Sequence, residues 1–252
     1  MKLIKSQVVF NPDEHTYMLG DKELSGITSV IGRQLFPDKY RDVPEDVLRK
    51  AAERGTMIHS ICELVDDMGI THDSDEAQGY KELKDDWGLR YECSEYLVSD
   101  NEHYASCIDK VYRENDTDFT LGDIKTTYVL DKESVRWQLS IYAYFFELQN
   151  PGCNAVRLIG IWLRGKNHEI VEVERIPSEI VINLLKCDSE GRQFVNPYSI
   201  SPVTLPGEYR KMERTIQEIV SQAKYWSDKK KEITDGVMMA MVEAGEYSWK
   251  GD

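Results

Sequence analysis

The fold is decided by Leu121-Gly122-Asp123-Ile124-Lys125-Thr126-Thr127, together with Ile108-Asp109 upstream. Each stretch places an acidic residue near the end of an apolar segment that is typical of a β-strand. Residues i and i+2 of a strand point to the same face, so Asp123 and Lys125 should project side by side, and Asp109 should reach them from the adjacent strand. Two carboxylates and one ammonium at a strand end suit a divalent metal ion and a water molecule that attacks a phosphodiester.

An Asp-x-Lys pattern by itself is weak, and the chain also contains Glu82-x-Lys84 and Asp228-x-Lys230. Both of these lie in polar segments with helical patterning, where acids and bases mostly serve solvation. Asp123 differs because apolar residues precede it on a predicted strand and Asp109 sits one strand upstream. The alternative interpretation of Asp109, Asp123 and Lys125 is a surface salt-bridge cluster.

The composition indicates one large domain, or one domain with appendages, because 41% of the 252 residues are hydrophobic and can form a core. No apolar run is long enough to span a bilayer, and residues 1–6 lack the hydrophobic segment of a signal peptide. We therefore expect a cytoplasmic protein without a membrane partner. The cysteines form no Cys-x-x-Cys pair, so we expect buried, reduced thiols and neither a zinc site nor a disulfide framework.

The net charge of −14 is unusual for a protein that acts on nucleic acid, because phosphate binding needs basic surface. Acids that hold a divalent metal ion are neutralised when the metal binds, and a catalytic groove needs only local positive charge. The charge argues against tight coating of DNA. It fits an enzyme that acts in a groove.

Apolar spacing and turn residues divide the chain into expected elements. We expect a hairpin over residues 8–19, and an apolar segment over 25–31 that leads into a loop. Helices are expected over 44–67, 76–87, 133–148, 177–191 and 207–235, and strands over 91–99, 104–112, 119–125, 155–163 and 169–173. This order predicts an α/β core in which a mixed central β-sheet is flanked by helices on both faces. The expected divisions are a hairpin and lead-in over 1–43, the core over 44–195, and a linker with a helical extension over 196–252.

A second group of polar residues lies in Arg54-Gly55-Thr56-Met57-Ile58-His59, followed by Glu63. His59 and Glu63 are four residues apart and share a helix face. A neutral imidazole is a competent ligand for a divalent metal ion, although Mg²⁺ prefers oxygen. Gly55 inside a helix costs about 1 kcal/mol relative to alanine, which suggests that another backbone or a substrate approaches closely. The alternative interpretation is a capped histidine in the core.

A third group consists of Gln138 and Tyr142, which share one face of the expected helix over 133–148. An amide and a phenol can position a phosphate or a base without adding charge. The alternative interpretation is the ordinary partial burial of a tyrosine beside a glutamine.

Taken together, these motifs resemble the PD-(D/E)xK nuclease superfamily, in its RecB-like (phage and mitochondrial-type) exonuclease branch. The resemblance consists of Arg-Gly-x-x-x-His at 54–59, the lone Asp109, Asp-x-Lys at 123–125 and Gln-x-x-x-Tyr at 138–142. It implies a restriction-endonuclease-like core. Ile108 precedes Asp109, so the proline–aspartate dipeptide of the family name is absent, as it often is in this branch. Some relatives hold an iron–sulfur cluster with four cysteines, but the spacing is missing here and no cluster is expected.

The resemblance implies that Asp109 and Asp123 bind Mg²⁺ or Mn²⁺. The carbonyl of Ile124 would be a further metal ligand, and His59 would complete the set. Lys125 would orient or deprotonate the attacking water and stabilise developing negative charge.

The resemblance also implies that Arg54, Gln138 and Tyr142 hold the substrate strand. Glu63 and Glu95 stay open, because each is either a further acid near the metal or a surface residue.

The function implied by the resemblance is metal-dependent hydrolysis of DNA phosphodiesters from DNA ends, leaving a 5′-phosphate. Such an enzyme would act in phage-type recombination or DNA repair, in the host cytoplasm if phage-encoded, with a single-strand annealing or other recombination protein as a possible partner. Two alternatives stay open. The first is a structure- or sequence-specific endonuclease of the same superfamily, and the second is a catalytically silent scaffold that binds DNA or protein.

The last expected helix carries an apolar stripe of Ile216, Ile219, Val220, Ala223 and Trp226. The stripe is expected to pack on the core or on a second copy rather than on DNA. The Met-rich residues 238–242 are a candidate contact in a homo-oligomer, because Met-rich surfaces adapt to partners.

Overall fold

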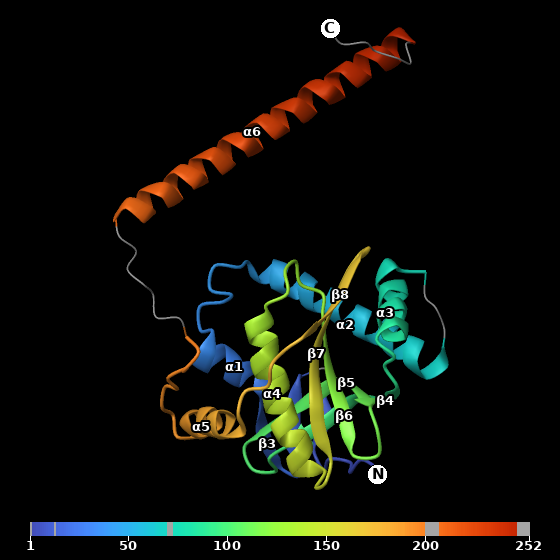
Figure 1. Ribbon diagram of the computed structural model, residues 1–252, viewed down its shortest axis with the longest axis vertical. Coiled ribbons are helices and arrows are strands. Elements are labelled where there is room, and N and C mark those ends of the chain that lie inside the picture. The colour runs from blue at the N-terminus through green and yellow to red at the C-terminus, as the bar shows by residue number, and fades with distance from the viewer. Residues whose placement is uncertain (1, 13, 70–72, 200–206, 246–252) are drawn as a thin grey trace. The chain divides into compact units, whose positions relative to one another are not determined.

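The computed structural model describes residues 2–12, 14–69, 73–199 and 207–245, and the chain divides into two units, Met1–Asn196 and Pro197–Asp252. Among the described residues, the first unit contains an eight-stranded sheet flanked by helices, and the second contains the helix α6 (Gly207–Ala244) (Figure 1). The predicted fold class, a mixed sheet flanked by helices with a helical C-terminal extension, is therefore confirmed.

The sheet is mixed because two of its strand pairs, β3–β5 and β6–β7, are parallel and the others are antiparallel. The strand order is β1-β2-β3-β5-β6-β7-β8, and β4 also pairs with β5. The strands are β1 (Val9–Asn11), β2 (Thr16–Leu19), β3 (Lys22–Gly26), β4 (Tyr91–Ser99), β5 (Tyr104–Arg113), β6 (Asp118–Lys125), β7 (Asn154–Arg164) and β8 (Asn167–Glu172).

Helices cover both faces of the sheet (Figure 1). One face packs on α1 (Ile27–Leu35), α4 (Lys132–Gln149) and α5 (Ser178–Ser189), and the other packs on α2 (Glu45–Met68) and α3 (Asp75–Asp86). The alternation of side chains along β7 separates the two cores. Leu158 lies in the core under α4, whereas Ile159 and Ile161 lie in the core under α2 and α3.

Local sequence sets the ends of the two helices that carry site residues. Glu45 and Asp46 lie in the first turn of α2, where they complement the helix dipole, and Gly69 ends the helix with a left-handed φ of 63°. Asp131 caps α4 by accepting a hydrogen bond from the Ser134 N–H at 3.0 Å.

Two expectations about helices were wrong. The expected apolar lead-in over 25–31 contains the start of helix α1, because Ile27, Val30 and Ile31 are buried at helical spacing against the core. The last helix continues past the expected end at 235 to Ala244, because Gly236 does not interrupt it and the left-handed residue is Gly245. Residues 200–206 of the expected linker lie outside the described residues.

The sheet divides at β5. One edge of β5 pairs with β4 over 105–112. The other edge pairs with β3 at 104–105 and with β6 at 110–113. Within the described part of the chain, 106–109 have no pairing strand on that edge, because β3 and β6 diverge there. Asp109 lies at this opening.

The described helices include none that is both long enough and apolar enough to cross a membrane.

Candidate functional site

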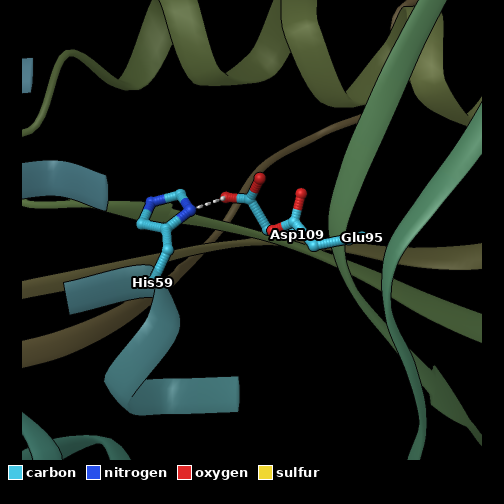
Figure 2. A group of neighbouring side chains, drawn as sticks. All are labelled: His59, Glu95 and Asp109. Atoms are coloured by element: carbon cyan, nitrogen blue, oxygen red, sulfur yellow. Dashed lines mark ion pairs between the residues drawn. The ribbon is translucent and has the colours of Figure 1, made fainter. Parts of the chain in front are cut away.

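Three possible metal ligands meet at the opening beside β5: His59 of α2, Glu95 of β4 and Asp109 of β5 (Figure 2). One ligand atom of each lies within 4.8 Å of the others. The His59 Nδ1 atom is 3.7 Å from Asp109 Oδ2, and His59 Nε2 is 3.1 Å from the carbonyl oxygen of Ile124. The group therefore joins α2 to the strands that carry the predicted catalytic residues.

The Asp109 carboxylate is held by the backbone of β6, the strand that is no longer paired with β5 at this point. Its Oδ2 atom accepts a hydrogen bond from the Ile124 N–H at 2.7 Å. This bond fixes the carboxylate between β5 and β6, at the place where the backbone ladder is interrupted. The side chain is 12% exposed, so it faces the opening without being freely solvated.

Asp123, the second predicted carboxylate, is fully buried on β6 and lies close to Lys125. Its Oδ2 atom is 2.7 Å from Lys125 Nζ, and its Oδ1 atom accepts a hydrogen bond from Gln138 Nε2 at 2.6 Å. The Gln138 Oε1 atom accepts from Lys125 Nζ at 3.1 Å. The amide of α4 thus links the carboxylate to the ammonium, as the spacing of residues i and i+2 on one strand allows.

Tyr142 contacts this group through Gln138. Its hydroxyl accepts hydrogen bonds from Gln138 Nε2 at 2.7 Å and from Ser106 Oγ at 3.2 Å. Both Gln138 and Tyr142 are buried, and they face Asp123 rather than solvent. Their predicted contact with a substrate stays a prediction.

Burial and neighbouring charges shift the pKa values of Asp123 and Lys125. Burial raises the pKa of Asp123 to about 6, and Asp109 adds to this rise while Lys125 opposes it. Desolvation lowers the pKa of Lys125, but the neighbouring carboxylates of Asp123 and Asp109 raise it more, so the net shift is upward. Lys125 is therefore protonated at neutral pH.

Glu95 reaches the site through an unusual backbone conformation. Its φ of 47° lies in the left-handed region, within a strand whose neighbours Ser94 and Tyr96 pair with Lys110 and Ile108. Glu95 thus sits across from Asp109. The pKa of its carboxyl is raised, first by desolvation and then by repulsion from Asp109, although the side chain as a whole is exposed.

These residues suit a divalent metal ion. Bonds of about 2.1 Å place neighbouring ligands of six-coordinate Mg²⁺ about 3 Å apart. The 3.1 Å between His59 Nε2 and the Ile124 carbonyl oxygen has this spacing. The buried carboxylate of Asp123 faces the Lys125 ammonium, with Oδ2 at 2.7 Å from Nζ, and it lies outside the described group of His59, Glu95 and Asp109. Asp109 adds a further carboxylate, and the imidazole favours Mn²⁺ somewhat more than a set of oxygens would.

Three other predicted residues lie beside the site or apart from it. Arg54 pairs with Glu76 of α3, so its guanidinium is engaged within the protein. Glu63 is half-buried and contributes to the raised pKa of Glu95, but it does not join the described ligand group. Gly55 is not tightly packed, because an added Cβ would meet only Thr126 Oγ1, at an ordinary 3.7 Å. No other backbone approaches Gly55 closely among the described residues, and the approach of a substrate there stays a prediction.

A buried polar group that no sequence pattern indicated lies on the other side of β5. Asp66 of α2 accepts hydrogen bonds from Lys110 Nζ at 2.7 Å, from Lys84 Nζ at 2.5 Å and from the Tyr80 hydroxyl at 2.7 Å. The side chains of Asp66 and Lys110 are 0% and 2% exposed. Lys110 also donates to Ser94 Oγ at 2.7 Å. We call this the Asp66 cluster.

A cavity of about 190 Å³ opens beside Lys125 and Gln138. Its wall comes from α1, the segment after α1 and the first turns of α4, and it is mostly apolar, with Ile31, Phe36 and Tyr40 among its residues. The cavity gives the Lys125 ammonium a route to a molecule outside the core.

No family model matches the sequence, and no curated protein matches it. Two solved structures are similar to part of the chain. The crystal structure of SSO0001 shares 15% identity and a TM-score of 0.42, over 75% of this chain and 89% of that one. The crystal structure of an alkaline exonuclease (LHK-Exo) from Laribacter hongkongensis shares 12% identity and a TM-score of 0.37, over 80% of this chain and 93% of that one. At these scores the two likenesses carry no argument about function.

Proposed function

We propose that the chain is a Mg²⁺- or Mn²⁺-dependent deoxyribonuclease that hydrolyses phosphodiester bonds from DNA ends. One observation carries the proposal: Asp109, Asp123 and Lys125 converge where β5 and β6 separate, with His59 and Glu95 beside them. A surface salt-bridge cluster would be solvated, whereas Asp123 is fully buried with a raised pKa. Burying carboxylates close together is costly, and it is typical of a site that binds a cation.

In this proposal Asp109, Asp123, His59 and the Ile124 carbonyl hold the metal ion, and Glu95 is a further carboxylate within reach. When bound, the metal ion would polarise the phosphodiester and lower the pKa of a water molecule. The water oxygen attacks phosphorus, and the bond to the 3′ oxygen breaks. The products carry a 5′-phosphate and a 3′-hydroxyl.

Lys125 acts as a cation in this proposal. Its raised pKa keeps it protonated at neutral pH, so it orients the attacking water and stabilises the charge on the phosphate rather than removing a proton. Gln138 positions both Lys125 and Asp123, and Tyr142 supports Gln138 from behind. The cavity beside Lys125 is where we place the DNA strand.

The proposal is tested by incubating end-labelled linear DNA and a covalently closed circle with Mg²⁺ and the purified chain. We expect nucleotides or short oligomers from the linear DNA alone. Lys125→Ala should reduce this rate by about 10²–10³, as removal of a charge-stabilising group does elsewhere. Comparison of 5′ and 3′ labels would give the polarity.

Lys81→Ala is the matched control, because Lys81 is half-exposed on α3 and pairs with Asp85. It removes the same charge and should leave the rate unchanged. Cutting of the closed circle would make the protein an endonuclease. No cleavage of either DNA with Mg²⁺ or Mn²⁺ would favour a silent scaffold.

We further propose, from the sequence resemblance, that the enzyme resects DNA in phage-type recombination or repair, together with a single-strand annealing protein. Such a pair would convert linear duplex DNA with short homologous ends into joined products. Joining should require both proteins and an active Lys125. Joining with the annealing protein alone would remove the support for this partner.

A further inference from the structure

The helix α6 spans 38 residues, which corresponds to a length of about 57 Å at 1.5 Å per residue. Among the described residues of its unit, α6 is the sole element of regular structure. It therefore has no other element of that unit on which to bury its apolar side chains. Ile216, Ile219 and Trp226 are all more than half exposed.

The apolar residues of α6 recur at alternating intervals of four and three. This seam, which we call the α6 seam, consists of Met212, Ile216, Ile219, Ala223, Trp226, Lys230, Ile233, Val237, Ala240 and Ala244. All members except Lys230 are apolar, and the seven-residue repeat continues for more than four heptads. On a helix that packs against a globular core, the apolar positions follow the helical period of 3.6 residues. A strict seven-residue repeat has a period of 3.5 residues, which keeps the same row of side chains against a partner helix when the two helices supercoil. Heptads sustained over this length are typical of a coiled coil.

The charge of α6 permits pairing with an identical helix. Residues 207–244 contain seven basic and seven acidic side chains, so the segment is neutral although the chain carries −14. Val220, Gln222 and Ser227 flank the seam and carry no charge, and Lys229, which also flanks it, pairs with Glu232 of the same helix. The other charged residues that flank the seam are Glu213 and Glu243. A second copy of α6 is therefore not repelled, whereas DNA finds no excess of positive charge on this helix.

Lys230 favours an antiparallel over a parallel arrangement of the two α6 helices. In a parallel pair in register, Lys230 would face Lys230 of the other copy inside the seam. In an antiparallel pair, Lys230 faces Trp226 of the other copy, where an ammonium lies favourably over an indole. The same alignment places Ile233 against Ala223 and Ile216 against Ala240, so large side chains meet small ones.

We propose that α6 pairs with α6 of a second copy of this chain as an antiparallel two-stranded coiled coil. Lys230, the single polar member of the seam, sets the register and limits the number of strands, as a lone polar residue at such a position does. Met238, Met239 and Val242 lie outside the seam and are not covered by this pairing.

The mass of the full-length chain in solution tests the proposal without reference to nuclease activity. Sedimentation equilibrium at micromolar concentration should give a dimer. The double variant Ile219→Asp/Ile233→Asp should be monomeric, with dimer affinity reduced at least 100-fold. Asp228→Asn, which lies outside the seam, should stay dimeric. The melting transition of unit Met1–Asn196 should be unchanged in both variants, which excludes loss of the fold.

Two outcomes would overturn the pairing: a monomeric full-length chain, or a dimer that survives the double variant. Orientation is tested with cysteines at the two ends of the seam. Under oxidation, a mixture of Met212→Cys and Ala244→Cys should form a linked pair beyond the level of the unmodified chain, and Met212→Cys alone should not. Efficient linkage of Met212→Cys to itself would overturn the antiparallel arrangement.

Discussion

Asp123 is the residue on which the proposed chemistry depends most. Its carboxylate is buried between an acid and a base, and burial raises its pKa to about 6. Its Oδ1 atom accepts a hydrogen bond from Gln138 Nε2, and its Oδ2 atom is 2.7 Å from the Lys125 ammonium. The two oxygens therefore have different partners: one faces a neutral amide, and the other faces an ammonium.

Asp123→Asn tests this division at nearly constant shape. The variant keeps an oxygen that can accept from Gln138, but it removes the charge that attracts a divalent cation. We expect Mn²⁺ binding to weaken at least tenfold and cleavage to fall by about 10²–10³. Calorimetry and a cleavage assay would measure the two effects, and circular dichroism would check the fold. Metal affinity equal to that of the original chain would show that Asp123 is not a ligand.

The sequence predicted the convergence of Asp109, Asp123 and Lys125 because strand alternation is readable from residue order. The sequence did not decide whether Glu95 lies near the metal or on the surface, and the reason is also physical. Glu95 faces the site because its backbone is left-handed in the middle of β4. A non-glycine residue seldom adopts this conformation, and no local sequence pattern predicts it. The burial of Gln138 and Tyr142 was also unreadable, because it depends on how α4 packs.

At the scale of elements, the long helix α2 carries both a site residue and a structural anchor. His59 lies at the site, and Asp66 lies seven residues later, two turns along the same face. Asp66 is bound to Lys110, the residue that follows Asp109 in β5. The Asp66 cluster therefore fixes α2 against β5, and with it the distance between His59 and Asp109.

Asp66→Asn should be strongly destabilising, because it leaves Lys110 buried without its partner charge. We expect a loss of about 3–5 kcal/mol in the free energy of unfolding by urea. Cleavage should also need more metal ion, because His59 is no longer held in place. Asp67→Asn is the control: Asp67 is exposed and accepts only from the Tyr91 hydroxyl in the described contacts. Equal stability of the two variants would contradict the anchoring role.

Asp188 ties α5 to α1 and β5. It accepts hydrogen bonds from Arg33 Nε at 2.5 Å, from Gln34 Nε2 at 3.1 Å and from the Tyr104 hydroxyl at 2.9 Å. Burial raises the pKa of the carboxyl, but these donors, Arg33 above all, lower it more, so the net shift is downward. A lowered pKa in the fold means that the stabilisation is present above the pKa of the unfolded chain and is lost as pH falls through the folded value.

Asp188→Asn should therefore cost about 1–3 kcal/mol near pH 7, where the native carboxylate is fully charged. The difference between the original chain and the variant should shrink below about pH 4, the usual range of an aspartate pKa. Urea unfolding at several pH values measures this. A difference that is independent of pH would assign the effect to packing rather than charge.

Most of the elements were predictable, because β4, β5 and β6 are apolar segments bounded by turn residues, and α2 and α4 have helical spacing with recognisable starts. The start of α1 was missed because Ile27, Val30 and Ile31 are β-branched and favour a strand locally, and burial against α4 and α5 overrides that preference. The Asp66 cluster was missed because charged residues in a polar helix usually face solvent, and only packing shows that these do not.

At the scale of the whole molecule, we expect the net charge of −14 to make DNA binding depend on the metal ion. Acids that repel phosphate in the absence of metal are neutralised when it binds. We expect Lys125→Ala, in which cleavage should be about 10²–10³ slower, to bind DNA at least tenfold more tightly with Mg²⁺ than with a chelator. Fluorescence anisotropy at constant ionic strength measures this. Equal affinities would place DNA binding away from the carboxylates.

The opening along β5 has a consequence for how the chain tolerates insertions and deletions. Asp109 and Lys110 are neighbours in sequence, but one faces the candidate site and the other faces Asp66. Because side chains alternate along a strand, a single-residue deletion within 104–109 would exchange these faces. It would place an ammonium among the proposed metal ligands and one carboxylate against another in the core. The same change in the turn 114–117 falls outside the paired strand and spares both faces. β5 thus places a carboxylate and an ammonium on opposite faces, one residue apart. Both faces require the same strand length, so neither tolerates a change in it.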